Sequence, residues 1–256
     1  MTMSWGMANP GHSQEKFIII IAITPIMKNN SFIGCINMTG TAQKQLHKPE
    51  AVFFDWDGTL VDSFAFLTKA HNSVKSQFGL SPFTGQEFSR YFGVPRDRLF
   101  MDIYGPHATD AKPVFEQYFH DNHLKEMVLI PGAEKMLDTI ASLGIPMGVV
   151  SNKRADFLRA EVEYLGWDKY FGDVVVGAGD AVADKPDPAP LIFAASMYDN
   201  IDIERIWYVG DTQIDVECSM AAGCTCVVVA PLETTTKGDI YEKNYQEICG
   251  FLLQCP

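Results

Sequence analysis

Short apolar runs that end in polar or glycine residues recur along the chain from residue 51 onward. The first, Ala-Val-Phe-Phe at 51–54, has no polar position and is followed directly by Asp55. Continuous apolar runs of this length are typical of strands that are buried on both faces of a parallel sheet. The pattern therefore predicts a strand at 51–55 and further strands at 146–151, 173–177, 206–210 and 225–229.

Segments rich in helix-forming residues fill the gaps between these predicted strands. They cover about 133–143, 154–165, 188–197 and 214–222, and a glycine follows three of them, where a helix C-cap is expected. Because strand and helix alternate, the predicted fold class is α/β, with a Rossmann-like parallel sheet core and helices on both faces. The segment after residue 233 contains apolar residues that predict one more packing helix.

About ninety residues separate the first predicted strand from the second, far more than a crossover needs. Within this segment apolar residues recur at helical spacing, with turn signals at 79–82 and 104–106. We expect 65–129 to be a small inserted α-helical domain. The core would then comprise 49–64 together with 130–256.

The first 48 residues have a different character. An apolar run at 17–27 is too short to cross a bilayer and has the length of a signal-peptide core, but Lys28 follows it where small residues would mark a cleavage site. We expect 1–48 to be a poorly ordered leader or a mis-assigned start, with translation beginning at Met38.

Composition and charge exclude some functions. The chain has 256 residues, 47% of them hydrophobic and 20% charged, as in an ordinary globular protein. The net charge is −12, and residues 50–256 carry sixteen Lys or Arg against thirty-one Asp or Glu. This balance argues against nucleic acid as a partner, because phosphate-backbone binding depends on clustered Lys and Arg. Six cysteines show no Cys-x-x-Cys spacing, which favours free thiols in a reducing cytoplasm.

The polar residues that end the first predicted strand carry the strongest chemical signal. Asp55 and Asp57 are two residues apart, and Gly58 and Thr59 follow. Ligands gather at the carboxyl ends of parallel strands, and two carboxylates placed there repel each other unless a cation is present. Mg²⁺ is typically bound by one or two carboxylates together with substrate phosphate oxygens. An Asp-Gly turn after a strand is the alternative that this motif alone leaves open.

Three later segments carry polar residues at comparable places. Ser151-Asn152-Lys153 ends the second predicted strand, Asp184-Lys185-Pro186 forms a proline-stiffened loop, and Asp211 ends the fourth strand, with Asp215 four residues on. In this order, the four segments resemble motifs I to IV of the haloacid dehalogenase superfamily, in its phosphoglycolate-phosphatase-like branch, over roughly 50–231. The resemblance implies that the inserted helices are the small cap of this superfamily, which lies over the active site.

The resemblance implies a role for each carboxylate of the first motif. Asp55 would attack phosphorus and form an aspartyl-phosphate, which divides one difficult hydrolysis into two easier steps. Asp57 would protonate the leaving group and then take a proton from the hydrolytic water. Relatives that remove halide or cleave a phosphorus–carbon bond lack an acid at this position, which leaves phosphate esters as the substrate class. Trp56 stands where Leu or Met is more usual, and we expect it to affect packing or cap contact more than catalysis.

The resemblance also implies which residues hold the metal and the phosphoryl group. Mg²⁺ would be bound by the Asp55 carboxylate, the Asp57 main-chain carbonyl and Asp211, with Asp215 orienting waters or a lysine. For Asp211 and Asp215, acids that favour a helix N-terminus are the alternative. The transferring phosphoryl group would be bound by Thr59, Ser151, Asn152 and Lys185.

Substrate specificity is expected in the cap. Arg96 lies in Gly-Val-Pro-Arg at 93–96, which resembles a segment of sugar-phosphate mutases whose arginine meets the substrate's distal anionic group. A surface arginine is the alternative. His120 and His123 have metal-like spacing on a predicted helix. We interpret them as part of a solvated helix face and not as metal ligands.

The residue patterns and the resemblance together predict a Mg²⁺-dependent phosphatase for a small phosphorylated metabolite. Phosphoglycolate, the first substrate to consider, is implied by the resemblance alone. A sugar phosphomutase of the same superfamily and a catalytically silent binding relative are the alternatives. We expect no nucleic-acid partner, no stable membrane association and a cytoplasmic location. The sequence predicts no particular oligomeric state.

Overall fold

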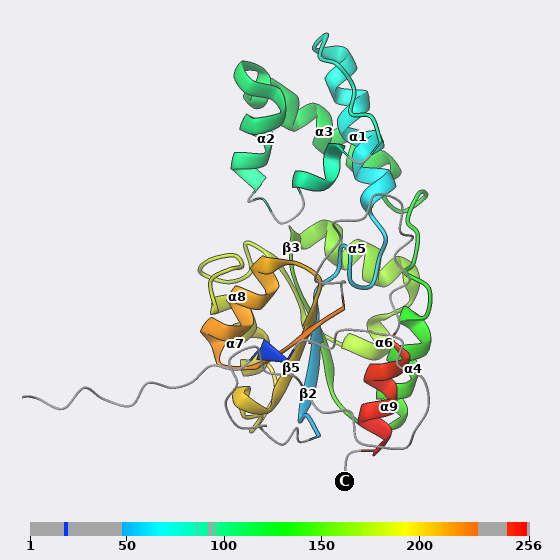
Figure 1. The fold of residues 1–256 in the computed structure, drawn as a ribbon, viewed down its shortest axis with the longest axis vertical. Helices are drawn as coiled ribbons and strands as arrows, with labels where there is room; N and C mark the ends of the chain where they lie inside the picture. Colours follow the sequence, from blue (N-terminus) through cyan, green and yellow to red (C-terminus); the bar gives the residue numbers. More distant parts are fainter. Residues whose placement is uncertain are drawn as a thin grey trace, which may run out of the picture.

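A parallel sheet lies at the centre of the α/β core (Figure 1). Its six strands have the order β1-β6-β5-β2-β3-β4. Every pair of neighbouring strands is parallel. The computed structural model describes residues 18–19, 48–85, 87–91, 94, 96–229 and 245–254, with the backbone alone at 18, 19, 96, 97 and 254. The strands are β1 (Ile18–Ile19), β2 (Ala51–Phe54), β3 (Met147–Arg154), β4 (Val175–Ala178), β5 (Ile206–Gly210) and β6 (Thr225–Val228).

Strand β2 lies where the order of the strands reverses. Its Val52 is in register with Met147 of β3 on one side and with Trp207 of β5 on the other. After β2 the chain runs outward through β3 and β4, and then returns to β5 and β6 on the opposite side. At such a switch point the loops at the carboxyl ends diverge and leave room for a ligand. The residues that follow β2 are therefore at the most favourable place for a site.

Helices cover both faces of the sheet, which explains why β2 has no polar position. Val52 and Phe54 pack with α4, α5, α6 and α9, whereas Ala51 and Phe53 pack with α7 and α8. All four side chains are fully buried, so each face of the strand contributes to a core. The helices are α4 (Ala133–Ser142), α5 (Ala155–Leu165), α6 (Asp168–Phe171), α7 (Ala189–Ser196), α8 (Gln213–Ala222) and α9 (Gln246–Gln254).

Three further helices, here called the cap helices, stand at one end of the sheet (Figure 1). They are α1 (Phe64–Gln77), α2 (Arg96–Tyr104) and α3 (Ala108–Asn122), and short 3₁₀ turns cover Glu87–Tyr91 and Gly105–His107. Their apolar faces form a separate hydrophobic cluster, to which α5 of the core contributes Phe157. The chain enters α1 shortly after β2, so the cap helices lie over the carboxyl ends of the strands.

The predicted α/β fold with an inserted helical cap is confirmed. Strand β3 runs to Arg154, three residues further than predicted, because Arg154 still pairs with Ala178 of β4 after an irregularity in the register. Helix α6 was not predicted, since four residues are too few to show helical spacing. The boundaries 65–129 for the inserted domain stay a prediction.

The C-terminal segment forms the predicted packing helix. Helix α9 lies against α4, with Ile248 and Leu252 buried in the same cluster. The hydroxyl of Tyr245, just before α9, donates a hydrogen bond to the main-chain carbonyl of Thr59. The C-terminal segment thus supports the loop that follows β2.

Some predictions concern the ends of the chain and its thiols. Within the described part, no helix is long and apolar enough to cross a membrane. Most of the predicted leader, with Met38, lies outside the described residues, and so do Cys35 and Cys255. The described cysteines are free thiols, and three of them are buried, as predicted.

Candidate active site

Asp55, the residue that directly follows β2, faces a buried lysine. Its carboxylate Oδ1 lies 2.8 Å from Nζ of Lys185, and the two residues are only 6% and 5% exposed. The same ammonium group donates to Oδ1 of Asp215 at 2.7 Å and to the Tyr208 hydroxyl at 2.8 Å. All three ammonium protons of Lys185 therefore have partners inside the protein, which is the condition for burying a charge.

These contacts shift the acidities of the three groups in different directions. Burial raises the pKa of the Asp55 carboxyl to about 7, although Lys185 lowers it, and Asp215 and Asp211 add to the rise. Burial alone would lower the pKa of Lys185, but the carboxylates of Asp215 and Asp55 hold it above its usual value. Burial acts to raise the pKa of Asp215, yet Lys185 and hydrogen bonds from Thr212 hold it below its usual range.

Three carboxylates gather around the end of β2. One oxygen from each of Asp55, Asp211 and Asp215 lies within 4.8 Å of the other two. An all-oxygen carboxylate set of this kind fits a hard divalent cation such as Mg²⁺. Asp211 approaches so closely that a Cβ at Gly58 would lie 2.4 Å from its Oδ2. The glycine of the first motif, which also has a φ of +83°, is therefore required for this cluster.

The two late aspartates are held by the residues around them. Asp211 accepts a hydrogen bond from the Thr59 hydroxyl at 2.9 Å. Asp215 uses Oδ1 for Lys185, while its Oδ2 accepts from the main-chain N–H of Thr212 at 2.9 Å in a capping box of α8. Both interpretations of Asp215, a helix-capping acid and a residue that orients Lys185, thus describe different oxygens of one side chain.

The predicted phosphate-binding residues occupy different positions. Ser151 lines the cavity beside Asp55, and its Oγ accepts from the N–H of Lys153 at 3.3 Å. Asn152 holds the Lys185 loop, because its amide exchanges two hydrogen bonds of 2.8 and 2.9 Å with the Lys185 main chain. Thr59 is fully buried beneath Asp211. The phosphate contacts predicted for these residues stay predictions.

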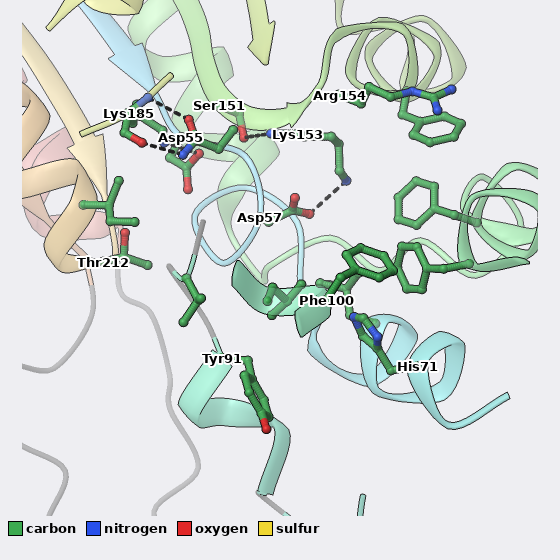
Figure 2. Close-up of a pocket in the computed structure, with 18 of the residues that line it drawn as sticks. Asp55, Asp57, His71, Tyr91, Phe100, Ser151, Lys153, Arg154, Lys185 and Thr212 are labelled. Atoms are coloured by element: carbon green, nitrogen blue, oxygen red, sulfur yellow. Dashed lines mark hydrogen bonds and ion pairs between the residues drawn. The ribbon is translucent and has the colours of Figure 1, made fainter. Parts of the chain in front are cut away.

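Asp57 has a partner that the sequence did not reveal. Its Oδ1 lies 2.9 Å from Nζ of Lys153 (Figure 2). The same Nζ lies 2.7 Å from Glu161 Oε2. Lys153 follows Ser151-Asn152 at the end of the second predicted strand, a signal that could have identified it. Two carboxylates hold this buried ammonium group, so the direction of the Asp57 side chain is fixed by Lys153.

Glu161 on α5 connects the first motif with the cap. This carboxylate is 2% exposed and accepts from Trp56 Nε1 at 2.5 Å, besides its contact with Nδ1 of His123 at 2.8 Å. The interpretation of His120 and His123 as a solvated face is therefore wrong for His123, which is buried, and holds for His120, which is exposed. Trp56 also packs edge-on against Trp167, in line with the expected packing role.

A cavity of about 220 Å³ lies between the residues at the carboxyl ends of the strands and the cap helices. Its core side includes Asp55, Asp57, Ser151 and Lys185, and Figure 2 shows Tyr91, His71 and Phe100 of the cap on the opposite side. The predicted catalytic pair and the predicted phosphate-binding lysine thus line one cavity. Arg96 begins α2, but its side chain lies outside the described residues.

Comparison with known proteins identifies the family. A family profile described as haloacid dehalogenase-like hydrolase matches residues 52–229, which is more than half of the chain. The chain belongs to this family. The match begins in β2 and ends just after β6, so it includes every motif that the sequence analysis singled out.

Relatives of this haloacid dehalogenase-like hydrolase are phosphatases. This chain is 33% identical to the phosphoglycolate phosphatase of Nitrosococcus oceani over 195 residues, which are 72% of this chain and 85% of that protein. It is 34% identical to the phosphoglycolate phosphatase of Rhodospirillum rubrum over 197 residues, which are 71% and 80% of the two chains. The family match and the phosphatase relatives together identify this protein as a phosphoric monoester hydrolase.

A solved structure agrees with the fold. The crystal structure of a predicted phosphoglycolate phosphatase from Haemophilus somnus superposes with a TM-score of 0.66 at 23% identity, and covers 72% of this chain and 86% of that chain. At this level of identity the likeness establishes the fold alone.

Proposed function

We propose that this haloacid dehalogenase-like hydrolase is a Mg²⁺-dependent phosphatase that cleaves a small phosphate monoester through a phosphorylated Asp55. The observation that carries the proposal is the shared cavity, which Asp55, its partner Lys185 and Asp57 all line. A buried carboxylate at the end of a strand can attack phosphorus in line with the departing oxygen.

Asp55 and Asp211, with the main-chain carbonyl of Asp57, are the residues we assign to Mg²⁺. The carboxylate cluster supports this assignment, and Asp215 lies close enough to hold a coordinated water. Bound Mg²⁺ would offset the repulsion between the anionic carboxylate and the anionic ester. Lys185 and the Ser151 hydroxyl would bind the phosphoryl oxygens, where charge is spread in the transition state.

Asp57 is the proposed acid and base. In the first step its proton would pass to the oxygen of the departing alcohol, and in the second step its carboxylate would take a proton from the water that cleaves the aspartyl-phosphate. Lys153 binds both Asp57 and Glu161, and we assign Lys153 and Glu161 to holding Asp57 in position.

Removal of the metal is expected to abolish phosphate release. We would measure release from phosphoglycolate, benzyl phosphate, a hexose phosphate and a nucleoside monophosphate, with Mg²⁺ or with excess EDTA. Phosphoglycolate is included because the two relatives compared above are phosphoglycolate phosphatases. Turnover with Mg²⁺ that disappears in EDTA and returns when Mg²⁺ is restored supports the proposal. If a folded protein that binds Mg²⁺ releases phosphate from none of the esters, the phosphatase is rejected in favour of a mutase or a binding protein.

Substitution of Asp57 by Asn is expected to separate the two chemical steps. The turnover of alkyl esters should fall by roughly 10²- to 10⁴-fold, because an alkoxide needs a proton to leave. With p-nitrophenyl phosphate, whose leaving group needs no proton, a burst of nitrophenolate equal to the enzyme concentration should precede slow turnover. The measurement is stopped-flow absorbance.

The matched control for this variant is Asp62→Asn, which changes an exposed carboxylate in the same loop. This variant should show wild-type turnover with both kinds of ester. An Asp57→Asn enzyme that loses equal activity toward both esters and shows no burst would assign Asp57 to folding or metal binding instead.

A further inference from the structure

The side of the cavity that receives the alcohol portion of the ester differs from the side that receives phosphate. In an in-line displacement the departing oxygen lies opposite the nucleophile. Asp55 and Lys185 lie on the sheet side of the cavity, so the alcohol of the ester must point toward the cap helices. The cap side of the cavity therefore decides which alcohols fit.

Among the described residues, the cap side of the cavity is lined by apolar and aromatic side chains and by His71. The 3₁₀ turn contributes Phe88 and Tyr91, helix α2 contributes Leu99 and Phe100, and α3 contributes Phe115 and Phe119. Several of these rings hold each other in place: the centroids of Phe100 and Phe115 are 5.4 Å apart in an edge-on arrangement, and those of Phe115 and Phe119 are 6.0 Å apart. We call these six residues the aromatic wall.

The polar group that interrupts this wall carries no charge near neutral pH. His71 of α1 lines the cavity, and its Nδ1 lies 2.8 Å from the hydroxyl of Tyr104. Burial lowers the pKa of His71 to about 3, and the charge of Lys75 lowers it further. A neutral imidazole can donate or accept one hydrogen bond, but it does not balance a carboxylate.

Among the described residues, the cations that line the cavity are already paired with acidic side chains. They are Lys153, Arg154 and Lys185, and all three belong to the core. Lys153 is bound to Asp57 and Glu161, and Lys185 to Asp55 and Asp215. Arg154 is paired with Glu116 at 3.3 Å and with Asp156 at 2.5 Å. An alcohol that carries its own carboxylate, such as glycolate, would lose hydration against the aromatic wall without gaining an unpaired cation from the described residues of the cavity.

We propose that the physiological ester has an uncharged, apolar or aromatic alcohol, which binds against the aromatic wall of the cap. This inference rests on the proposed phosphatase function and narrows its substrate class. The chemistry is unchanged: the bond between phosphorus and the alcohol oxygen breaks, the alcohol leaves with the proton of Asp57, and water later takes the phosphoryl group from Asp55. What the wall adds is selection, because an apolar ring buries its surface there and a charged alcohol does not.

The test compares benzyl phosphate with phosphoglycolate, since both release unactivated alkoxides and differ mainly in the charge and apolar surface of the alcohol. Wild type should show a kcat/KM for benzyl phosphate that is at least about 10-fold higher. Leu99→Arg places a cation in the aromatic wall and should reverse this preference. The matched control is Met101→Arg on the same helix, which is 59% exposed and does not line the cavity, and it should leave the ratio unchanged.

Each remaining outcome decides between the inference and the function on which it rests. A wild-type preference for phosphoglycolate overturns the inference and leaves the phosphatase intact. Loss of that preference in Arg96→Ala would then make Arg96 the carboxylate ligand. Absence of release from both esters and from p-nitrophenyl phosphate overturns the proposed function itself. Calorimetry on the Asp55→Asn variant tests the same preference by binding alone: tighter binding of benzyl phosphate supports the wall, and tighter binding of phosphoglycolate overturns it.

Discussion

Asp55→Asn is expected to lower phosphate release by roughly 10⁴-fold or more, the largest effect on activity of any substitution in this chain. The amide has nearly the size and shape of the carboxylate, so it fits the same buried place beside Lys185. It cannot form the aspartyl-phosphate, because its nitrogen and oxygen carry no negative charge. The measurement is the initial rate of phosphate release at saturating ester and Mg²⁺.

The control for this prediction is Asp173→Asn, which removes an exposed carboxylate that does not line the cavity and should keep wild-type turnover. Acid quenching of wild type during turnover, followed by mass spectrometry, should find the phosphoryl group on the peptide that contains Asp55. Residual activity of more than a few per cent, in a variant shown by mass to be free of deamidation, would place the nucleophile elsewhere.

The sequence was sufficient to predict which strands carry the candidate residues at their carboxyl ends. The carboxyl ends of parallel strands meet at one edge, so Asp55 after β2, Asp211 after β5 and Ser151 in the second half of β3 lie toward the same edge of the sheet. The apolar runs predicted these strands because both faces of the sheet are covered. Local chemistry, expressed in a few adjacent residues, is what a single sequence shows well.

Contacts between distant segments were beyond that reach. Glu161 receives hydrogen bonds from Trp56 and His123, which are 105 and 38 residues away, and nothing near Glu161 in sequence indicates either partner. A buried acid on a helix looks like an exposed one until the helix is placed. The same holds for the aromatic wall: helical spacing predicted the cap helices, but which rings turn toward Asp55 depends on how those helices pack.

Lys185→Met is expected to have the largest effect on stability. Removing the ammonium group leaves the buried carboxylates of Asp55 and Asp215 without the cation that they share. Breaking such a buried pair costs about 3–5 kcal/mol in the free energy of unfolding, because the charges left behind remain desolvated. Denaturant unfolding of the metal-free protein at pH 7 measures it. Lys169→Met, which changes a lysine on the surface, is the matched control and should leave the midpoint unchanged.

Acid and metal should each reduce this loss, and the directions follow from linkage. Without Lys185 the pKa of Asp215 would rise above its unfolded value, so the penalty is present above the folded pKa and disappears as the pH falls. Added Mg²⁺ should stabilise the variant more than wild type, since the ion supplies the missing charge.

A double-mutant cycle with Asp55→Asn shows whether the two residues act as a unit. Because they share one contact, the loss caused by Lys185→Met should be smaller in the Asp55→Asn background, by about 0.5–3 kcal/mol. Additive losses would mean that Lys185 stabilises the fold through Asp215 and Tyr208 alone. In that case the 2.8 Å contact between Lys185 and Asp55 serves catalysis and does not contribute to stability.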